Sequence, residues 1–163
     1  MKHFLALVLG FTLSLGAVAA AEMNVQWITR LEDAQKIAQA DKKDLLVNFT
    51  GSDWCIWCIR LKKEVFVQPA FAAATKDFVL VELDYPRKNL QTDAEKKINA
   101  QLAKKYGIEG YPTILLMNAK GEVYAQTGYM SGGPEKYLQH LLELKKNNTE
   151  AGILKYQAEK NAR

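Results

Sequence analysis

The only two cysteines of the chain, Cys55 and Cys58, lie three positions apart in the segment GSDWCIWCIR (residues 51–60). Two thiols at this spacing can contribute to a metal site, close a short structural loop, or interconvert between dithiol and disulfide. These three kinds of chemistry require different residues elsewhere in the chain, so the rest of the sequence discriminates between them.

The metal site and the structural loop find little support in the rest of the sequence. A structural zinc site needs four ligands, whereas residues 22–163 offer two cysteines and one histidine, His140, in an expected helix. Copper(I) needs fewer ligands, and Met130 is a soft candidate ligand, so a copper metallochaperone is kept as an alternative, as is a non-catalytic, redox-dependent binding module. A disulfide across four residues constrains the unfolded chain least, because that effect grows with loop length. We therefore expect no bound metal.

Redox chemistry agrees with the elements expected around the two cysteines. The apolar run LLVNFT (residues 45–50) is typical of a buried strand, and a helix is expected to start near Cys55. The free N–H groups and the dipole at a helix N-terminus stabilise a thiolate at that position. Cys58, one turn further on, can attack a mixed disulfide formed by Cys55. We therefore expect Cys55 to be accessible with a lowered pKa, and Cys58 to be shielded.

The remaining sequence predicts a single α/β domain at residues 22–147, followed by a polar C-terminal tail at residues 148–163 that frays. The candidate strands are residues 24–27, 45–50, 78–84, 112–118 and 122–129. The candidate helices are residues 30–43, 93–107, 133–147 and the segment after Cys55, which Pro69 should interrupt. A βαβ unit followed by a hairpin predicts a central mixed β-sheet with helices on both faces.

Residues 1–21 have the pattern of a cleaved secretory signal peptide. Lys2 and His3 precede an apolar stretch from Phe4 to Leu15, and Ala19 and Ala21 have the spacing of a cleavage site. The apolar stretch is too short to span a bilayer comfortably. Export places the two cysteines in a compartment where disulfides persist.

The charged residues argue against a nucleic-acid partner. The net charge is +4, and the basic residues alternate with acids in segments such as EKKINAQLAKK and LLELKK. A nucleic-acid-binding surface would instead show a basic stripe, often with interleaved aromatic residues. We expect these charges to form solvated helix faces.

Two motifs together resemble the thioredoxin-fold thiol–disulfide oxidoreductases, over roughly residues 25–146. The segment WCIWC (residues 54–58), directly after a buried strand, resembles the active site of that family. Within YGIEGYPTILLMN (residues 106–118), the segment GYPT resembles its cis-proline loop. The export pattern and the lead-in TGSDWC are similar to the bacterial periplasmic, DsbH-like branch of the family.

The resemblance implies a periplasmic or secreted enzyme that carries out dithiol–disulfide exchange on protein substrates. Cys55 and Cys58 are then the catalytic pair, and no organic cofactor is needed because the two sulfurs carry the electrons. The expected partners are proteins with disulfides or thiols and a membrane-embedded thiol electron donor. The resemblance also implies a cis bond before Pro112 and a substrate groove. The groove residues are expected to be Trp54, Trp57, Tyr111, Pro112 and Gly128.

The sequence departs from thioredoxin in two ways that bear on mechanism. Ile56 and Trp57 replace the usual Gly-Pro between the cysteines, and their uncharged side chains desolvate the sulfur and disfavour a thiolate. We therefore expect a reductase or isomerase rather than a strong oxidant. Asn48 stands where thioredoxin has a buried acid, and the lysine that pairs with this acid is also absent. The proton acceptor for Cys58 is left open between Asp53, Glu82 and water, and the step can also proceed without assistance.

Overall fold

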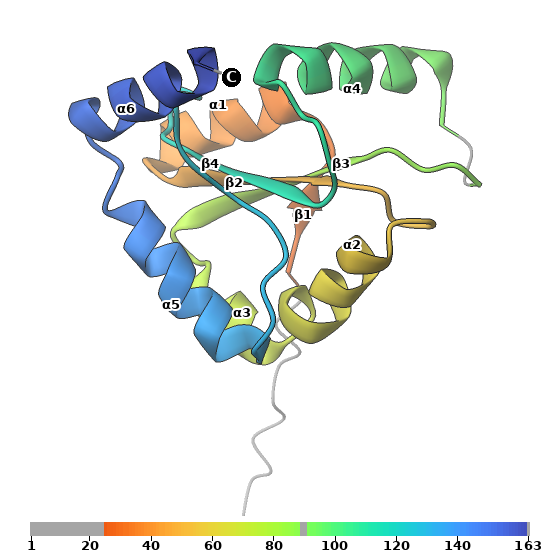
Figure 1. The fold of residues 1–163 in the computed structure, drawn as a ribbon, viewed down its shortest axis with the longest axis horizontal. Coiled ribbons are helices and arrows are strands. Elements are labelled where there is room, and N and C mark those ends of the chain that lie inside the picture. Colours follow the sequence, from red (N-terminus) through yellow and green to blue (C-terminus); the bar gives the residue numbers. More distant parts are fainter. Residues whose placement is uncertain (1–24, 89–90, 163) are drawn as a thin grey trace, which may run out of the picture.

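The computed structural model describes residues 25–88 and 91–162, so the predicted signal peptide lies outside the described residues. Its centre is a five-stranded mixed sheet with strand order β1-β3-β2-β4-β5 (Figure 1). Strands β1, β3 and β2 are parallel, and β4 and β5 run antiparallel to their neighbours. The strands are β1 (Trp27–Ile28), β2 (Asp44–Thr50), β3 (Phe78–Asp84), β4 (Thr113–Met117) and β5 (Val123–Thr127).

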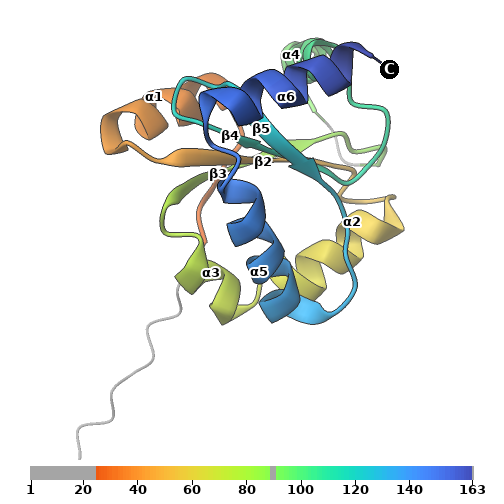
Figure 2. The same ribbon diagram turned by 60° about the vertical axis from the view of Figure 1, so that its left-hand side comes forward.

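Helices cover both faces of this sheet, which confirms the predicted fold class (Figures 1 and 2). One face carries α2 (Ile56–Leu61), the π-helical turn η1 (Lys62–Phe66), α3 (Pro69–Ala74) and α5 (Gly133–Lys145). The other face carries α1 (Leu31–Asp41), α4 (Asp93–Tyr106) and α6 (Glu150–Asn161). Among the described residues, no helix is both long enough and apolar enough to cross a bilayer.

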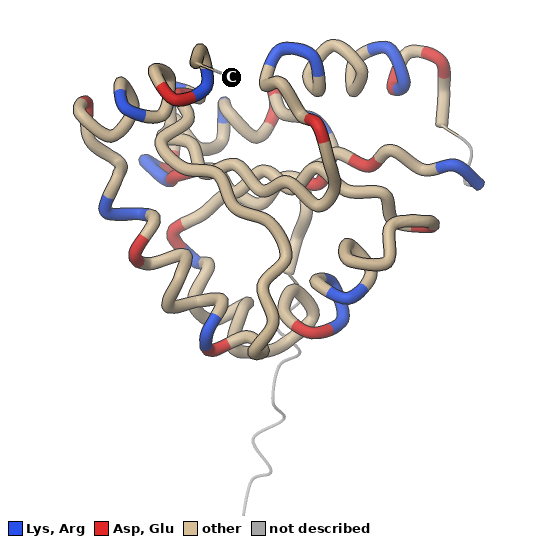
Figure 3. Tube along the Cα trace, in the orientation of Figure 1, with Lys and Arg blue, Asp and Glu red and all other residues tan. Residues whose placement is uncertain are grey.

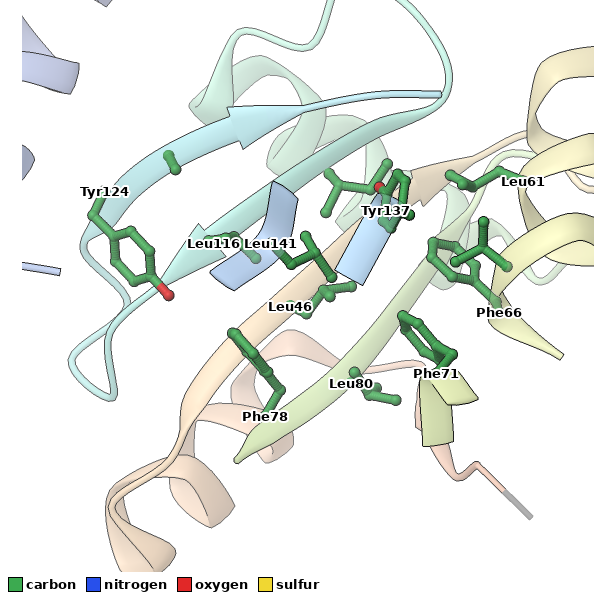
Figure 4. Packing of buried hydrophobic residues seen from close by; sticks show 13 residues of the cluster. Leu46, Leu61, Phe66, Phe71, Phe78, Leu80, Leu116, Tyr124, Tyr137 and Leu141 are labelled. Atoms are coloured by element: carbon green, nitrogen blue, oxygen red, sulfur yellow. The ribbon is translucent and has the colours of Figure 1, made fainter. Parts of the chain in front are cut away.

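Strand β2 is central to both hydrophobic cores, because all seven of its residues are buried. Side chains alternate between the faces of a strand, so Leu46 packs into the core on the α2 and α5 side, whereas Leu45 and Val47 pack into the core on the α1 side. Figure 4 shows Leu46 among the aromatic residues of the first core. The strand thereby fixes the position where the chain leaves the sheet toward the cysteines.

The helical segment after the cysteines is not uniform. Pro69 interrupts it as predicted, because α3 begins at that residue. The π-helical turn η1 between α2 and α3 was not predicted. Such turns are rare and occur frequently at functional sites.

The prediction that residues 148–163 form a fraying tail outside the domain is wrong for most of that segment. Helix α6 occupies Glu150–Asn161, its Thr149 hydroxyl accepts a hydrogen bond from Gly152 N, and it lies against β5. The Lys160 ammonium donates to the Gly107 carbonyl at 2.8 Å, and the Tyr156 hydroxyl lies 3.1 Å from Gln126 Oε1. Helix α6 has no buried residue, but its partly buried Ile153 and Tyr156 pack against the two hydrophobic cores, so apolar contacts and hydrogen bonds both attach it.

A buried polar cluster joins the start of this segment to β2. The carboxylate of Asp44, 9% exposed, accepts hydrogen bonds from the Tyr124 hydroxyl at 3.0 Å and from Asn148 Nδ2 at 3.0 Å. We expect Asp44→Ala to lower the free energy of unfolding by about 1–3 kcal/mol, because the buried Tyr124 hydroxyl loses its acceptor and the exposed Asn148 loses its contact with β2. Urea denaturation measures this change. Asp41→Ala, which removes an exposed acid at the end of α1, should change stability by less than about 0.5 kcal/mol.

Candidate active site

Cys55 and Cys58 form a disulfide at the point where the chain leaves β2 and enters α2. Cys55 is the N-cap residue of α2, and its sulfur accepts a hydrogen bond from Cys58 N at 3.2 Å. The structure therefore places the first sulfur at a helix N-terminus, where the local dipole favours negative charge. In this disulfide form both residues are buried, with exposed fractions of 6% and 4%. The expected difference in accessibility concerns the reduced form and stays a prediction.

The segment before the cysteines is joined to the loop after β3 by two carboxylates. Asp84 accepts hydrogen bonds from Ser52 N at 2.9 Å and Ser52 Oγ at 2.6 Å. In the opposite direction, Asp53 accepts from the backbone N–H groups of Arg87 at 2.9 Å and Lys88 at 2.7 Å. Asp53 therefore holds this loop and does not cap α2, since Cys55 is the N-cap residue.

Trp54 is held by contacts with these two segments and with Tyr111. Its indole Nε1 donates to the Tyr85 carbonyl at 2.8 Å, and its ring lies under the guanidinium of Arg87 at 3.8 Å. A Cβ atom at Gly51 would overlap the indole, so the tight approach of the ring requires glycine there. Tyr111 meets the same ring edge-on, with 5.6 Å between ring centroids. These contacts give Trp54 a packing role beside Cys55.

Trp57, between the cysteines, is 48% exposed and belongs to a different network. Its ring lies 5.0 Å from that of Tyr129, and the Arg60 guanidinium is about equally close to both rings, at 5.3 and 5.2 Å. Glu64 completes the network, because it accepts hydrogen bonds from Arg60 Nε at 2.9 Å and the Tyr129 hydroxyl at 2.8 Å. These two bonds lower the pKa of Glu64 and keep it ionised.

An open groove of about 720 Å³ lies beside the disulfide and the loop before β4. Three of the predicted groove residues line it, namely Trp57, Tyr111 and Pro112. The Tyr111–Pro112 peptide bond is cis. Gly128 lies behind this loop, since a Cβ at that position would be 3.0 Å from the Pro112 carbonyl oxygen. The lining residues that were not assigned to the groove from the sequence are Arg60, Tyr129, Met130, Ser131 and Lys136.

Only one of these additional lining residues had a usable signal in the sequence. Arg60 follows Trp57 by three positions, and residues at this spacing are neighbours on a helix. Tyr129, Ser131 and Lys136 come from the segment after β5 and the first turn of α5. Their approach to α2 depends on tertiary packing, which the local pattern does not encode.

A small polar cluster lies beneath α2 on the otherwise apolar face of the sheet. Asn48 and Glu82 are neighbours in the β2–β3 register, and both point to the α2 side, as Leu46 and Leu80 do two residues earlier. Asn48 is 3% exposed, and its Oδ1 has no hydrogen-bond partner among the described residues. Lys62 Nζ of η1 lies 3.8 Å from Glu82 Oε1. Burial raises the pKa of Glu82, and Lys62 offsets part of that shift.

Metal-ligating groups do not cluster within residues 25–88 and 91–162. No group of three or more His, Cys, Asp or Glu side chains in these ranges could hold a metal ion. His140, the histidine considered as a ligand, instead lies with Nε2 2.9 Å from the Thr127 hydroxyl. Met130 is in the groove lining.

Comparisons with known proteins agree with this geometry. A family model described as a thioredoxin-like domain matches residues 31–145. The chain is 34% identical over 122 residues to the disulfide bond reductase DsbH of Chlamydia pneumoniae, covering 74% of this chain and 72% of that protein. It is 30% identical over 137 residues, 80% of this chain, to the thiol:disulfide interchange protein DsbD of Vibrio vulnificus (strain CMCP6), but spans only 21% of DsbD.

Solved structures show the same relationship. A DsbH oxidoreductase has a TM-score of 0.74 at 28% identity, with 83% of this chain and 94% of that chain covered. A thioredoxin from Thermus thermophilus shares the fold, with a TM-score of 0.60 at 20% identity over 78% of this chain and 92% of that one. The chain therefore belongs to the thioredoxin-like family, and its Cys55–Cys58 disulfide places it among the thiol–disulfide oxidoreductases of that family.

Proposed function

We propose that this protein is an exported oxidoreductase that reduces or isomerises disulfide bonds in other proteins. The observation that carries the proposal is the Cys55–Cys58 pair at the start of α2, beside an open groove. In the reduced protein, the Cys55 thiolate attacks a substrate disulfide, forms a mixed disulfide and releases one substrate thiol. The Cys58 thiolate then attacks the Cys55 sulfur, releasing the second thiol. Two electrons and two protons pass to the substrate, and the protein becomes the disulfide.

The surroundings of Cys55 favour reduction over oxidation of substrates. A strong oxidant holds its first cysteine as a thiolate, whereas Ile56 and Trp57 bring no charge to this site. The nearest cations on the helix are engaged elsewhere, because Arg60 binds Glu64 and Lys62 lies beside Glu82. The similarity to a protein named disulfide bond reductase supports the same direction.

Glu82 is the group we assign as proton acceptor for Cys58. Asp53 is committed to the loop after β3, whereas Glu82 points from β3 toward α2, on the same side of the sheet as the buried amide of Asn48. Its raised pKa suits proton exchange with a thiol near neutral pH, because a base works best when its pKa approaches the working pH. Lys62 lies 3.8 Å from Glu82 and favours its ionised form, which is the form that accepts a proton.

The expected location is the bacterial periplasm, reached through the signal peptide of residues 1–21. That compartment is kept oxidising, so a reductase working there needs a continuous supply of electrons. A membrane-embedded thiol carrier is the partner that meets this need. The similarity to DsbD, a thiol:disulfide interchange protein, supports a place in such a thiol exchange chain.

The reduction potential of the Cys55–Cys58 couple tests the proposed direction. We expect a value near that of thioredoxin, about −270 mV, rather than that of DsbA, about −120 mV, because the helix N-terminus stabilises the thiolate of Cys55 without help from a neighbouring charge. Equilibration with glutathione buffers, followed by quantification of free thiols, measures it. A potential above about −150 mV would make the protein an oxidase.

A catalytic assay separates this function from the alternative of a copper metallochaperone. A reductase accelerates the reduction of insulin by dithiothreitol and cycles between dithiol and disulfide. A metallochaperone would hold copper(I) in a fixed ratio and show no turnover. Mass spectrometry under native conditions reads the copper stoichiometry on the same sample.

A further inference from the structure

The lining of the groove beside the disulfide has basic residues and no acidic residue. It includes Arg60 and Lys136, three aromatic side chains, Pro112 and Met130. Figure 3 shows the basic residues in blue along α2 and η1, at the start of α5 and in the loop after β3. The acid nearest to Lys136 in sequence, Glu135, is not part of the lining.

The carboxylates around this site are already bound by donors of the protein itself. Glu64 accepts from Arg60 and Tyr129, and Asp53 accepts from two backbone N–H groups of the loop after β3. Glu82 lies beside Lys62 beneath the helix. These acids therefore have donors or a cation of their own, and they contribute little repulsion toward a negatively charged group in the groove.

Lys136 differs from Arg60 because its aliphatic side chain packs against Gly132 and its ammonium group is unpaired. Gly132 has a φ of +116°, and a Cβ atom there would come within 2.6 Å of Lys136 Cδ, so the glycine leaves room for the aliphatic stem. Lys136 is exposed and forms no ion pair with any described residue. Lys136 therefore places an unpaired ammonium group at the edge of the groove.

Arg60, whose charge is paired with that of Glu64, supplies further hydrogen-bond donors to the groove lining. Its guanidinium lies over the rings of Trp57 and Tyr129, and only its Nε donates to Glu64 among the described residues. The terminal nitrogens of a guanidinium are suited to bind a carboxylate. Arg60 and Lys136 can therefore both donate hydrogen bonds to a carboxylate in the groove.

We propose that the groove selects extended protein segments that carry an acidic side chain next to the reacting cysteine, with Lys136 as the contact that determines this preference. The proposal rests on the proposed function, because it assigns the groove to the substrate of the disulfide exchange. Rim charges act mainly on the rate of association and on its salt dependence. The preference therefore appears in the bimolecular step that forms the mixed disulfide.

The test uses three disulfide-linked peptide dimers that differ only in the residues flanking the cysteine, which are Glu, Gln or Lys. Each rate with the reduced protein is divided by the rate of the same peptide with dithiothreitol, which removes differences in intrinsic reactivity. We expect the Glu peptide to react about three to ten times faster than the Lys peptide, in line with exposed ion pairs. The ratio should shrink at high salt, because the charges are screened.

The variant Lys136→Glu should abolish or invert that ratio, whereas Lys120→Glu, the same change in the turn between β4 and β5, should leave it unchanged. Equal normalised rates for all three peptides with the wild-type protein would overturn the proposal, as would a ratio that Lys136→Glu leaves intact. Hydroxyethyl disulfide is neutral and lacks a peptide, so it tests the disulfide exchange activity separately from the preference for acidic segments. If the reduced wild-type protein fails to react with it, the proposed function itself fails.

Discussion

Cys58→Ser is expected to arrest the reaction at a mixed disulfide between Cys55 and the substrate protein, whereas Cys55→Ser should trap nothing. The first attack needs only the sulfur at the start of α2, and the release of product needs the second sulfur one turn later. Either substitution should reduce turnover in the insulin assay to the background rate. Non-reducing gel electrophoresis with mass spectrometry identifies the trapped species.

The two variants serve as each other's control, because each removes one sulfur from the same disulfide. Alkylation of the reduced wild-type protein adds an independent measurement. We expect iodoacetamide to modify Cys55 much faster than Cys58, since the helix N-terminus favours the Cys55 thiolate. In the disulfide form the two residues are almost equally buried. Equal labelling rates after reduction would show that the assigned roles are wrong.

Glu82→Gln should slow the decay of the mixed disulfide by about 100-fold near neutral pH, the lower end of the effect of a positioned general base. The carboxylate must be ionised to accept the Cys58 proton, so the wild-type rate should rise as pH increases through the raised pKa of Glu82. In the Glu82→Gln variant this rise of the rate with pH should be absent. The difference should fade above about pH 9, where a thiol with a pKa of about 8.5 ionises unaided. Single-turnover kinetics over a pH series measure the effect.

Two further variants distinguish proton transfer from a structural role of Glu82. Lys62 lowers the pKa of Glu82, so in Lys62→Met the rise of the rate with pH should occur at higher pH. Asn48 is the register neighbour of Glu82, and Asn48→Asp in the Glu82→Gln background should restore part of the rate. An unchanged pH profile in Glu82→Gln would exclude this residue as the proton acceptor.

The parts of the fold that were predictable from the sequence depend on local patterns. The apolar run of β2, the hairpin of β4 and β5 and the interruption at Pro69 each have a short-range physical cause, and the structure confirms these elements. The two cysteines and the segment around Pro112 indicated the site because their residue types and positions resemble one family. These signals require no knowledge of the tertiary structure.

The elements that were missed depend on long-range contacts. Helix α6 has no buried residue and only a weak apolar pattern, and its hydrogen bonds reach Gly107 and Gln126 in distant parts of the chain, as the bond of Asn148 just before it reaches Asp44. The groove cation Lys136 approaches α2 only because α5 packs against η1. The π-helical turn has no distinctive composition, so its sequence reads as ordinary helix.

The hydrogen bond from Lys160 to the Gly107 carbonyl links the end of the chain to the loop that leads to Pro112. Gly107 has a φ of +57°, a backbone conformation that favours glycine, and it lies directly beside the end of the Lys160 side chain. A protease that trims the last few residues would remove this anchor five residues before the groove-lining proline. The enzyme would then keep its cysteines and its sheet but lose a restraint on one wall of the groove. Cleavage within α6 is therefore expected to loosen the groove wall that Pro112 forms, without any change at the disulfide.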